Sequence, residues 1–500
     1  MAVSDQVALV RAMRDEVDEA VTAAEWTGRD HLSYAFDGEQ VGRGREHWLY
    51  DFVLPAHATI GDAPVEVRSQ GRRVTGWSAG AEGRRARIAL AEDLGKLVER
   101  ARIEVDALGP LRDLRLRLTE LAADPRLGRD ESIPFHVGQA ATVLGAPGGR
   151  LQDDIAQAAD SADSWSLDDR QADVLRTALL HRWAFVQGSP DGDAVGFLAR
   201  LLDRLHESDA SVLFVSSDPT MVDQTLLRLC EQLLGRAGLR SGVLQRIGAI
   251  GLPELQERYG PLVDPNVITA DLHAEIDRQG TELDGVDLWM QHEEAVALHA
   301  DAEEAYNDLA QRRERARGRV VRTPWGDNPD RLLVQMHQLR PQVNSARGHR
   351  DQMAAKLGKL PPSSEMSDAA ARIRETRTFI ERRRALWKAR EELTRTRQRI
   401  VGALHQRCRI VATTPGRVFG RRLPRSSFDV VVIAGPLSPP EAFYLGGLST
   451  RSVIAVGDPD RRPVPAETRR GDQPHSLERS RRRPLARLGR RDREPADWRP

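Results

Sequence analysis

Residues 428–435 read FDVVVIAG, a short run rich in Val and Ile that ends at a glycine. The segments RIVATT (409–414) and SVIAVGD (452–458) have a similar composition. Runs of this kind are typical of strands that are buried on both faces of a parallel sheet. The C-terminal part of the chain is therefore expected to contribute three parallel strands.

Upstream, strand candidates alternate with predicted helices of about 10–15 residues. The strand candidates are WAFVQG (183–188), SVLFVSS (211–217) and SGVLQRIG (241–248). Such alternation predicts βαβ units and hence a parallel sheet. The expected fold class is α/β, with one domain formed by 161–265 and 405–466 around a long insertion.

The insertion, 266–404, consists of long charged stretches with helical periodicity. Its apolar positions fall on one stripe and are Leu272, Ile276, Leu283, Val286 and Met290. An antiparallel helical stalk is the natural interpretation, and an isolated coiled coil is the alternative.

The N-terminal region, 1–160, is expected to hold an amphipathic helix within 1–30, followed by a small β-rich, barrel-like domain. Its strand candidates are HWLYDFVL (47–54), APVEVRSQ (63–70), RRVTGWSA (72–79) and RRARIAL (84–90). Gly and Asp residues separate these short alternating runs, which favours strands over helices.

The charge balance excludes a basic field over the whole chain, because 74 Lys and Arg residues are matched by 74 Asp and Glu residues. The tail differs: residues 461–500 hold 13 Arg against 6 acidic residues, with repeated Pro. Disorder is expected over 467–500 because such a composition buries little apolar surface.

The cysteine count and the distribution of apolar residues bear on the cellular compartment of the protein and on whether it contacts a membrane. The two cysteines, Cys230 and Cys408, are too few for a disulfide framework or a zinc cluster. The N-terminus lacks the pattern of a signal peptide, and no run of 18 apolar residues occurs. We therefore expect a cytoplasmic protein, from a bacterium with GC-rich DNA, that has no membrane partner.

The segment AFVQGSPDGDAVGFLARLL (184–202) has the order strand, glycine-containing turn and helix, which is typical of a phosphate-binding loop. The full pattern ends in Lys followed by Ser or Thr, which bind the phosphates and Mg²⁺. Here Ala194 and Val195 occupy those two positions, and Asp191 and Asp193 lie within the turn.

Six segments follow one another in a recognisable order. They are LDDRQADVL (167–175), VQGSPDGDAV (186–195), SSDPTMVD (216–223), IVATT (410–414), FDVVVIAGPLS (428–438) and VGDPDRRPV (456–464). Their order and spacing resemble superfamily 1 helicases, in the branch of the nonsense-mediated-decay and Okazaki-fragment helicases. The helical insertion and the β-rich region before the first motor domain fit this family as well.

The resemblance implies a RecA-like P-loop NTPase domain, with ATP and Mg²⁺ as cofactors and single-stranded DNA or RNA as partner. The implied nucleotide-binding positions are Gln171, Gly188, Pro190, Gly192, Ala194, Val195 and Asp458. The implied positions facing nucleic acid are Asp223, Thr413 and Thr414.

The sequence departs from the family at the positions that carry out ATP hydrolysis. Ala434 and Gly435 stand where the family has the Asp that orders Mg²⁺ and the Glu that activates water. Arg461 replaces the glutamine that senses the γ-phosphate. No catalytic residue of the family is intact, no metal site is expected, and neither tight Mg·ATP binding nor hydrolysis is expected.

The expected function is that of a degenerate, non-hydrolysing helicase-like protein that binds nucleic acid or a protein partner. Candidate phosphate contacts are Arg312, Arg313, Arg315, Arg317, Arg382, Arg383 and Arg384. One alternative is an active ATP-dependent helicase or translocase that takes its second RecA-like domain from another chain. Another is a structural interaction protein that acts through the helical stalk.

Overall fold

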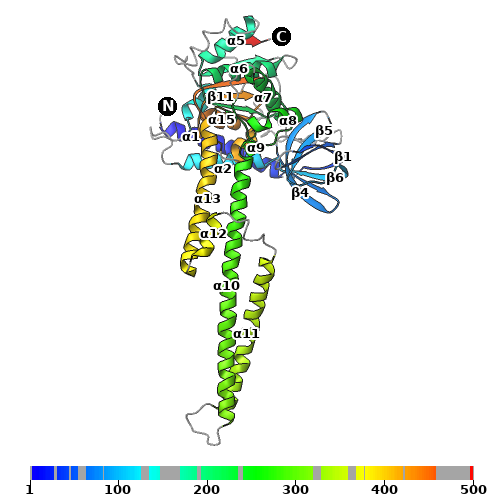
Figure 1. Ribbon diagram of the computed structural model, residues 1–500. Helices are drawn as coiled ribbons and strands as arrows, with labels where there is room; N and C mark the ends of the chain where they lie inside the picture. The colour runs from blue at the N-terminus through cyan, green and yellow to red at the C-terminus, as the bar shows by residue number, and fades with distance from the viewer. Residues whose placement is uncertain are drawn as a thin grey trace. The chain divides into compact units, whose positions relative to one another are not determined.

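The computed structural model of the chain forms two compact units, one of Met1–Ile268 with Ala403–Pro500 and one of Thr269–Gly402 (Figure 1). The described residues are 3–26, 31–43, 47–54, 63–82, 84–124, 135–146, 169–188, 193–234, 240–318, 328–358, 368–376, 378–420, 423–457 and 496–498. Within them, no helix is long and apolar enough to cross a membrane.

A parallel sheet forms the centre of the first unit. Its strands are β7 (Trp183–Gly188), β8 (Val212–Ser216), β9 (Leu244–Arg246), β10 (Ile410–Thr413), β11 (Phe428–Ala434), β12 (Ser449–Gly457) and β13 (Ala496–Trp498). The strand order is β13-β7-β12-β11-β8-β10-β9, and every paired neighbour runs parallel. The expected α/β class with a parallel sheet is confirmed.

Helices cover both faces of this sheet, because successive side chains of a strand point to opposite sides. On β11, Val430 and Val432 pack into one core, and Val431 and Ile433 pack into the other. The first core includes α5 (Asp169–Leu180), α6 (Ala194–Glu207), α7 (Pro219–Leu234) and α8 (Pro253–Val263). The second includes α1 (Val3–Trp26), α2 (Gly109–Ala123), α3 (Val137–Val143), α14 (Pro415–Gly420) and α15 (Pro439–Gly447).

Strand β13 differs from the disorder that the sequence predicts for 467–500. Ala496–Trp498 pair with β7, with Ala496 opposite Val186. An edge strand presents unpaired N–H and C=O groups, which a short segment can pair whatever its side chains are. The rest of that tail lies outside the described residues, and its predicted disorder stays a prediction.

A closed six-stranded barrel precedes the sheet in the sequence. Its strands are β1 (His31–Arg43), β2 (Trp48–Val53), β3 (Pro64–Ser69), β4 (Arg72–Glu82), β5 (Arg85–Leu90) and β6 (Leu97–Val105), in the order β1-β2-β5-β4-β3-β6. Tyr50, Phe52, Val67, Ile88 and Ile103 fill the interior and are fully buried.

Two strands of the barrel, β1 and β6, are absent from the sequence prediction. In β1, the pair Asp37-Gly38 has the composition of a hairpin turn. The chain continues through it instead, with Asp37 at φ +48 and a shift in the pairing with β2 between Phe36 and Glu39. Gly38 is required there, because a Cβ would lie 2.4 Å from the ring of Phe52.

The barrel is joined to the sheet domain by a chain of charged contacts. Arg87 binds both carboxylate oxygens of Asp51 at 2.6 and 2.7 Å, and also donates to the carbonyl of Gly251 at 2.7 Å. The amide of Gly251 donates to Asp223 at 2.6 Å, and Asp223 accepts from Arg246 Nε at 2.7 Å. A barrel strand is thereby linked, through the loop after β9, to helix α7.

The second unit is helical. Its helices are α10 (Ala270–Arg317), α11 (Pro329–Leu357), α12 (Asp368–Glu375) and most of α13 (Phe379–Arg407). Of the predicted apolar stripe, Ile276, Leu283, Val286 and Met290 are buried, whereas Leu272 is 54% exposed. Helix α11 packs antiparallel against the distal half of α10 (Figure 1), and α12 and α13 share an apolar core with Leu283, Val286 and Met290.

The Asp223–Arg246 pair is expected to carry much of the stability at the barrel junction. Asp223→Asn leaves Arg246 buried without its counterion, and removal of one partner of a buried pair costs about 3–5 kcal/mol. We expect a loss of that size in the free energy of unfolding, measured by urea titration. As a control, Glu254→Gln breaks the exposed pair with Arg258 and is expected to cost less than about 1 kcal/mol. Equal losses in the two variants would contradict this account.

Candidate functional site

The carboxyl ends of the parallel strands gather the segments that the sequence singles out. Val186 of β7 lies opposite Val456 of β12, which lies opposite Ala434 of β11, which lies opposite Ser216 of β8. The connections after these strands therefore leave from one edge of the sheet. Ligands of open α/β sheets bind at this edge, where connections diverge to opposite faces. Here α7 follows β8 on one face, and α15 follows β11 on the other.

The N-terminus of α6 is capped by the chain's own carboxylate. Asp193 Oδ1 accepts a hydrogen bond from the amide of Gly196 at 2.8 Å. The N-terminus of a helix binds phosphate through backbone amides that have no partner within the helix, and through the positive end of the helix dipole. Asp193 therefore uses one of the donors that a phosphate would need, and adds a negative charge where a phosphate would lie.

The first turn of α6 offers no replacement for the missing cation. Ala194 and Val195 begin the helix and are half-buried, and neither carries a charge or a hydroxyl. Gln171 lies in α5, and Gly188 is the last residue of β7. Pro190, Gly192, Asp458 and Arg461 lie outside the described residues.

The end of β11 also lacks groups for metal-dependent hydrolysis. Ala434 is buried, and Gly435 follows it with φ +96, a conformation that side chains other than glycine's rarely adopt. A Cβ on Gly435 would lie 3.1 Å from Ser217 Oγ, and its amide donates to the carbonyl of Val456 at 3.0 Å. The backbone at this position therefore favours glycine, independently of the missing carboxylate.

The three residues implied to face nucleic acid are buried within the fold. Asp223 accepts from Arg246 and from the amides of Gly251 and Leu252. Burial raises its pKa, and these donors act against that shift. Thr413 donates to the carbonyl of Ile247 at 2.8 Å.

Thr414 is also buried, with 2% of its surface exposed. A phosphate contact by Asp223, Thr413 or Thr414 would thus require this part of the fold to open. The structure gives Asp223 a structural role that the sequence did not indicate, since its partner Arg246 lies on a separate strand.

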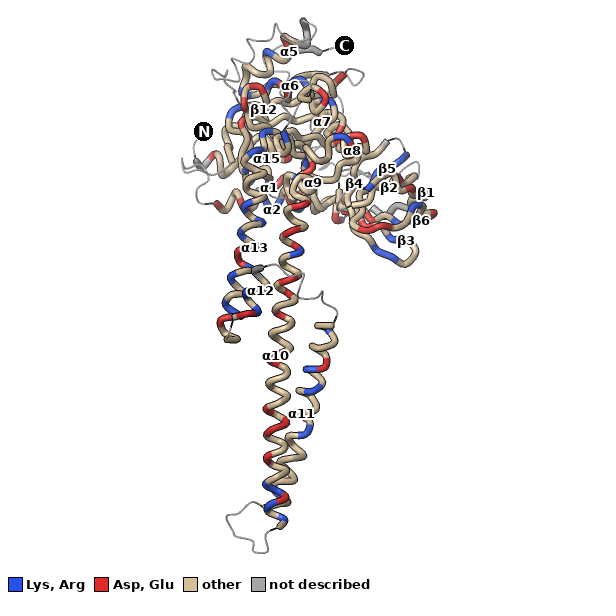
Figure 2. The backbone as a smooth tube through the Cα atoms, in the orientation of Figure 1, with Lys and Arg blue, Asp and Glu red and all other residues tan. Residues whose placement is uncertain are grey.

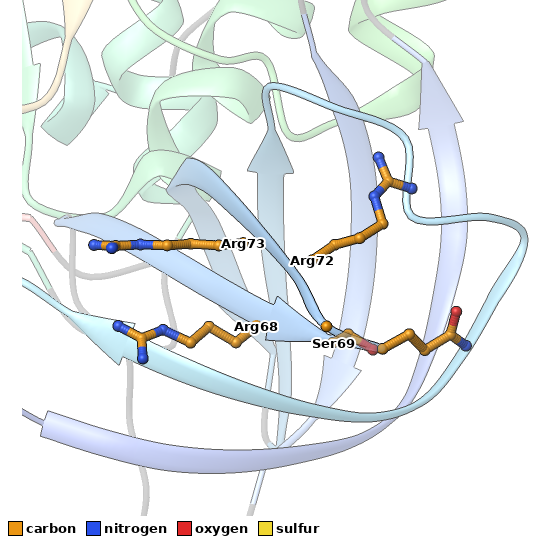
Figure 3. Close-up of a pocket in the computed structure, with 6 residues that line it drawn as sticks. Arg68, Ser69, Arg72 and Arg73 are labelled. Atoms are coloured by element: carbon orange, nitrogen blue, oxygen red, sulfur yellow. The ribbon is translucent and has the colours of Figure 1, made fainter.

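A hollow on the barrel surface is lined by the β3–β4 hairpin (Figure 3). In Figure 3, Arg68 and Arg73 extend side by side and Arg72 points elsewhere. Arg68 and Arg73 both bind Glu66, and Arg72 binds Glu92 at 3.2 Å. Each guanidinium in this hollow is already paired, so the hollow is a poor phosphate site.

Among the residues that the structure describes, no group of three or more His, Cys, Asp or Glu side chains is placed to hold a metal ion. The two cysteines are fully buried, and burial raises the pKa of both thiols to about 12. Neither Cys230 nor Cys408 is therefore a nucleophile at neutral pH.

The Asp193 cap yields a direct prediction. Asp193→Ala removes the acceptor for the Gly196 amide, and loss of an N-cap costs about 0.5–2 kcal/mol. We expect a loss of that size in the free energy of unfolding in urea. Asp193→Asn and Asp193→Ser retain an acceptor and are expected to stay close to the wild type. A loss in all three variants would mean that the charge of Asp193, and not its capping bond, stabilises α6.

No protein-family model matches the sequence, and a comparison with curated proteins finds no match.

Proposed function

We propose that this chain is a helicase-like protein that has lost ATP hydrolysis and acts by binding single-stranded nucleic acid. The observation that carries the first half of the proposal is the Asp193 carboxylate at the N-terminus of α6. Support for a RecA-like ancestry comes from the motif order in the sequence. The parallel sheet with covered faces is consistent with that ancestry.

Electrostatics oppose nucleotide binding at this edge. A polyphosphate near Asp193 meets a like charge, which costs about 4 kcal/mol at a separation of about 4 Å and an effective dielectric near 20. The chain has no lysine between Lys96 and Lys356 to offset that cost. Without a carboxylate at Ala434 or Gly435, the end of β11 also has no group to order Mg²⁺ or activate water.

The second half of the proposal rests on basic residues away from the sheet edge. Helix α13 contains eight Arg and one Lys against three Glu. Cations clustered on one element attract the phosphate backbone, which dominates the affinity of proteins for nucleic acid. Binding of nucleic acid needs no nucleotide. It would explain why the parallel α/β scaffold is kept although the residues for ATP hydrolysis are missing.

The proposal is tested by equilibrium binding with the full chain. We expect no binding of a fluorescent ATP analogue up to millimolar concentration, with or without Mg²⁺. A labelled single-stranded oligonucleotide is expected to bind in the absence of nucleotide, with an affinity that falls steeply as salt rises. Polyglutamate of similar charge, as competitor, separates phosphate recognition from simple charge attraction.

Two outcomes contradict the proposal. Micromolar, Mg²⁺-dependent binding of the ATP analogue would favour the active helicase or translocase. Absence of oligonucleotide binding at low salt would leave the helical unit as a protein-interaction element.

A further inference from the structure

Helix α13 exposes the indole of Trp387 beside three cationic side chains. The side chain of Trp387 is 65% exposed, and so is that of Ile380 two turns earlier. Arg383 and Arg384 lie four and three residues before Trp387, and Lys388 follows it. Residues three and four apart are neighbours on a helix surface. Ile380, Arg383, Arg384, Trp387 and Lys388 therefore form one surface, here called the Trp387 face.

The other side of α13 is neutralised by the acidic helix α10, which holds thirteen Asp and Glu against five Arg. Arg390 binds Asp284 at 2.5 Å and Asp287 at 3.2 Å, and Arg382 binds Glu293 at 2.5 Å. Figure 2 shows acidic residues along α10 and basic residues along α13. The cations of α13 that meet α10 are thus already paired.

The cations of the Trp387 face differ from those that contact α10. No carboxylate in the described ranges lies within ion-pair distance of Arg383, Arg384 or Lys388. Arg383 instead lies over the ring of Phe379 at 5.4 Å. The acidic residues within one turn of these cations bind other groups. Glu381 accepts from Thr378 at 2.7 Å, Glu391 is bound to Arg395 at 2.6 Å, and Glu392 is bound to Arg399. The Trp387 face therefore carries three positive charges available to an anionic ligand.

Trp289 and Trp387, the tryptophans of the helical unit that the structure describes, also differ in their surroundings. Trp289 packs against the unit's apolar core, and Arg374 and Arg382 lie over its ring at 5.0 and 4.9 Å. Trp387 has no ring or cation partner among the residues that the structure describes. Its indole has one large apolar surface open to a planar ligand.

We propose that the Trp387 face binds single-stranded nucleic acid, with a base stacked on the indole and phosphates bound by Arg384 and Lys388. This inference rests on the proposed function and assigns its binding surface. Stacking requires an open base face, which single strands provide and a paired duplex does not. Aromatic rings interleaved with cations are the common means of sequence-tolerant binding to single strands.

The test is fluorescence anisotropy of labelled oligothymidylate and oligouridylate with the full chain. Trp387→Ala is expected to weaken binding about 5- to 150-fold, the range for loss of one base stack. Trp387→Phe retains an aromatic ring and is expected to keep most of the affinity. Arg384→Glu with Lys388→Glu is expected to weaken binding and to lower the salt slope by about 0.7 for each phosphate that the variant no longer binds.

Matched controls lie on α11 of the same unit. Val334 is 56% exposed, and Arg331 and Arg340 are without a carboxylate partner among the described residues. Val334→Ala and Arg331→Glu with Arg340→Glu are expected to leave the affinity within about twofold of the wild type, because they lie off the Trp387 face. Far-UV circular dichroism verifies that each variant retains its helices.

The outcomes separate this inference from the proposed function. Oligonucleotide binding by the wild type that Trp387→Ala leaves unchanged overturns the assigned surface alone. Absence of binding by the wild type overturns the proposed function as well. Binding that is lost in the Glu variants but insensitive to Trp387→Ala, and that polyglutamate displaces, assigns the face to an acidic protein partner and also overturns the inference.

Discussion

The buried ion pair between Asp223 and Arg246 is the contact on which the junction of barrel and sheet depends. A charge removed from water is tolerated only when its remaining hydrogen-bonding capacity is satisfied. Asp223 meets this condition through Arg246 and the amides of Gly251 and Leu252. These bonds fix the loop after β9, and the carbonyl of Gly251 in that loop accepts from Arg87 of the barrel. Asp223 on α7 is thereby connected, through this loop, to the barrel.

That edge has the arrangement at which parallel α/β sheets bind ligands, but its described residues lack the groups that phosphate chemistry requires. β7, β8, β11 and β12 all end at this edge, and α7 and α15 follow β8 and β11 on opposite faces of the sheet. Yet Asp193 caps α6, and Gly435 has a backbone conformation that disfavours a side chain. A nucleotide site at this edge would therefore require a change in the local backbone geometry as well as more than one substitution.

The sequence predicted the parallel strands well, because a strand buried on both faces must be apolar throughout. β8 and β11 are examples, with nearly every residue buried. It did not predict β6, in which charged residues such as Glu99 and Arg100 interrupt the alternation over Leu97–Val105. Nor did it predict β13, since pairing at an edge depends on backbone groups and not on composition.

The site was predictable in part. Substitutions at Ala194, Val195, Ala434 and Gly435 are visible in the sequence, but the capping bond of Asp193 depends on where α6 begins. The burial of Asp223 depends on Arg246, which is brought close only by the pairing of β9 with β10. The arginine run on α13 was also visible in the sequence. The packing against α10 distinguishes its members: Arg382 is paired with Glu293, whereas Arg384 has no carboxylate partner in the part of the chain that the structure describes.

The most direct test of the central claim, a retained scaffold without ATP chemistry, is phosphate release from ATP by the purified full chain, with Mg²⁺ and with or without single-stranded oligonucleotide. The account predicts release at the rate of buffer alone in both conditions. Oligonucleotide-stimulated release that is lost in an Ala194→Glu variant would contradict it, because the activity would then arise at the N-terminus of α6.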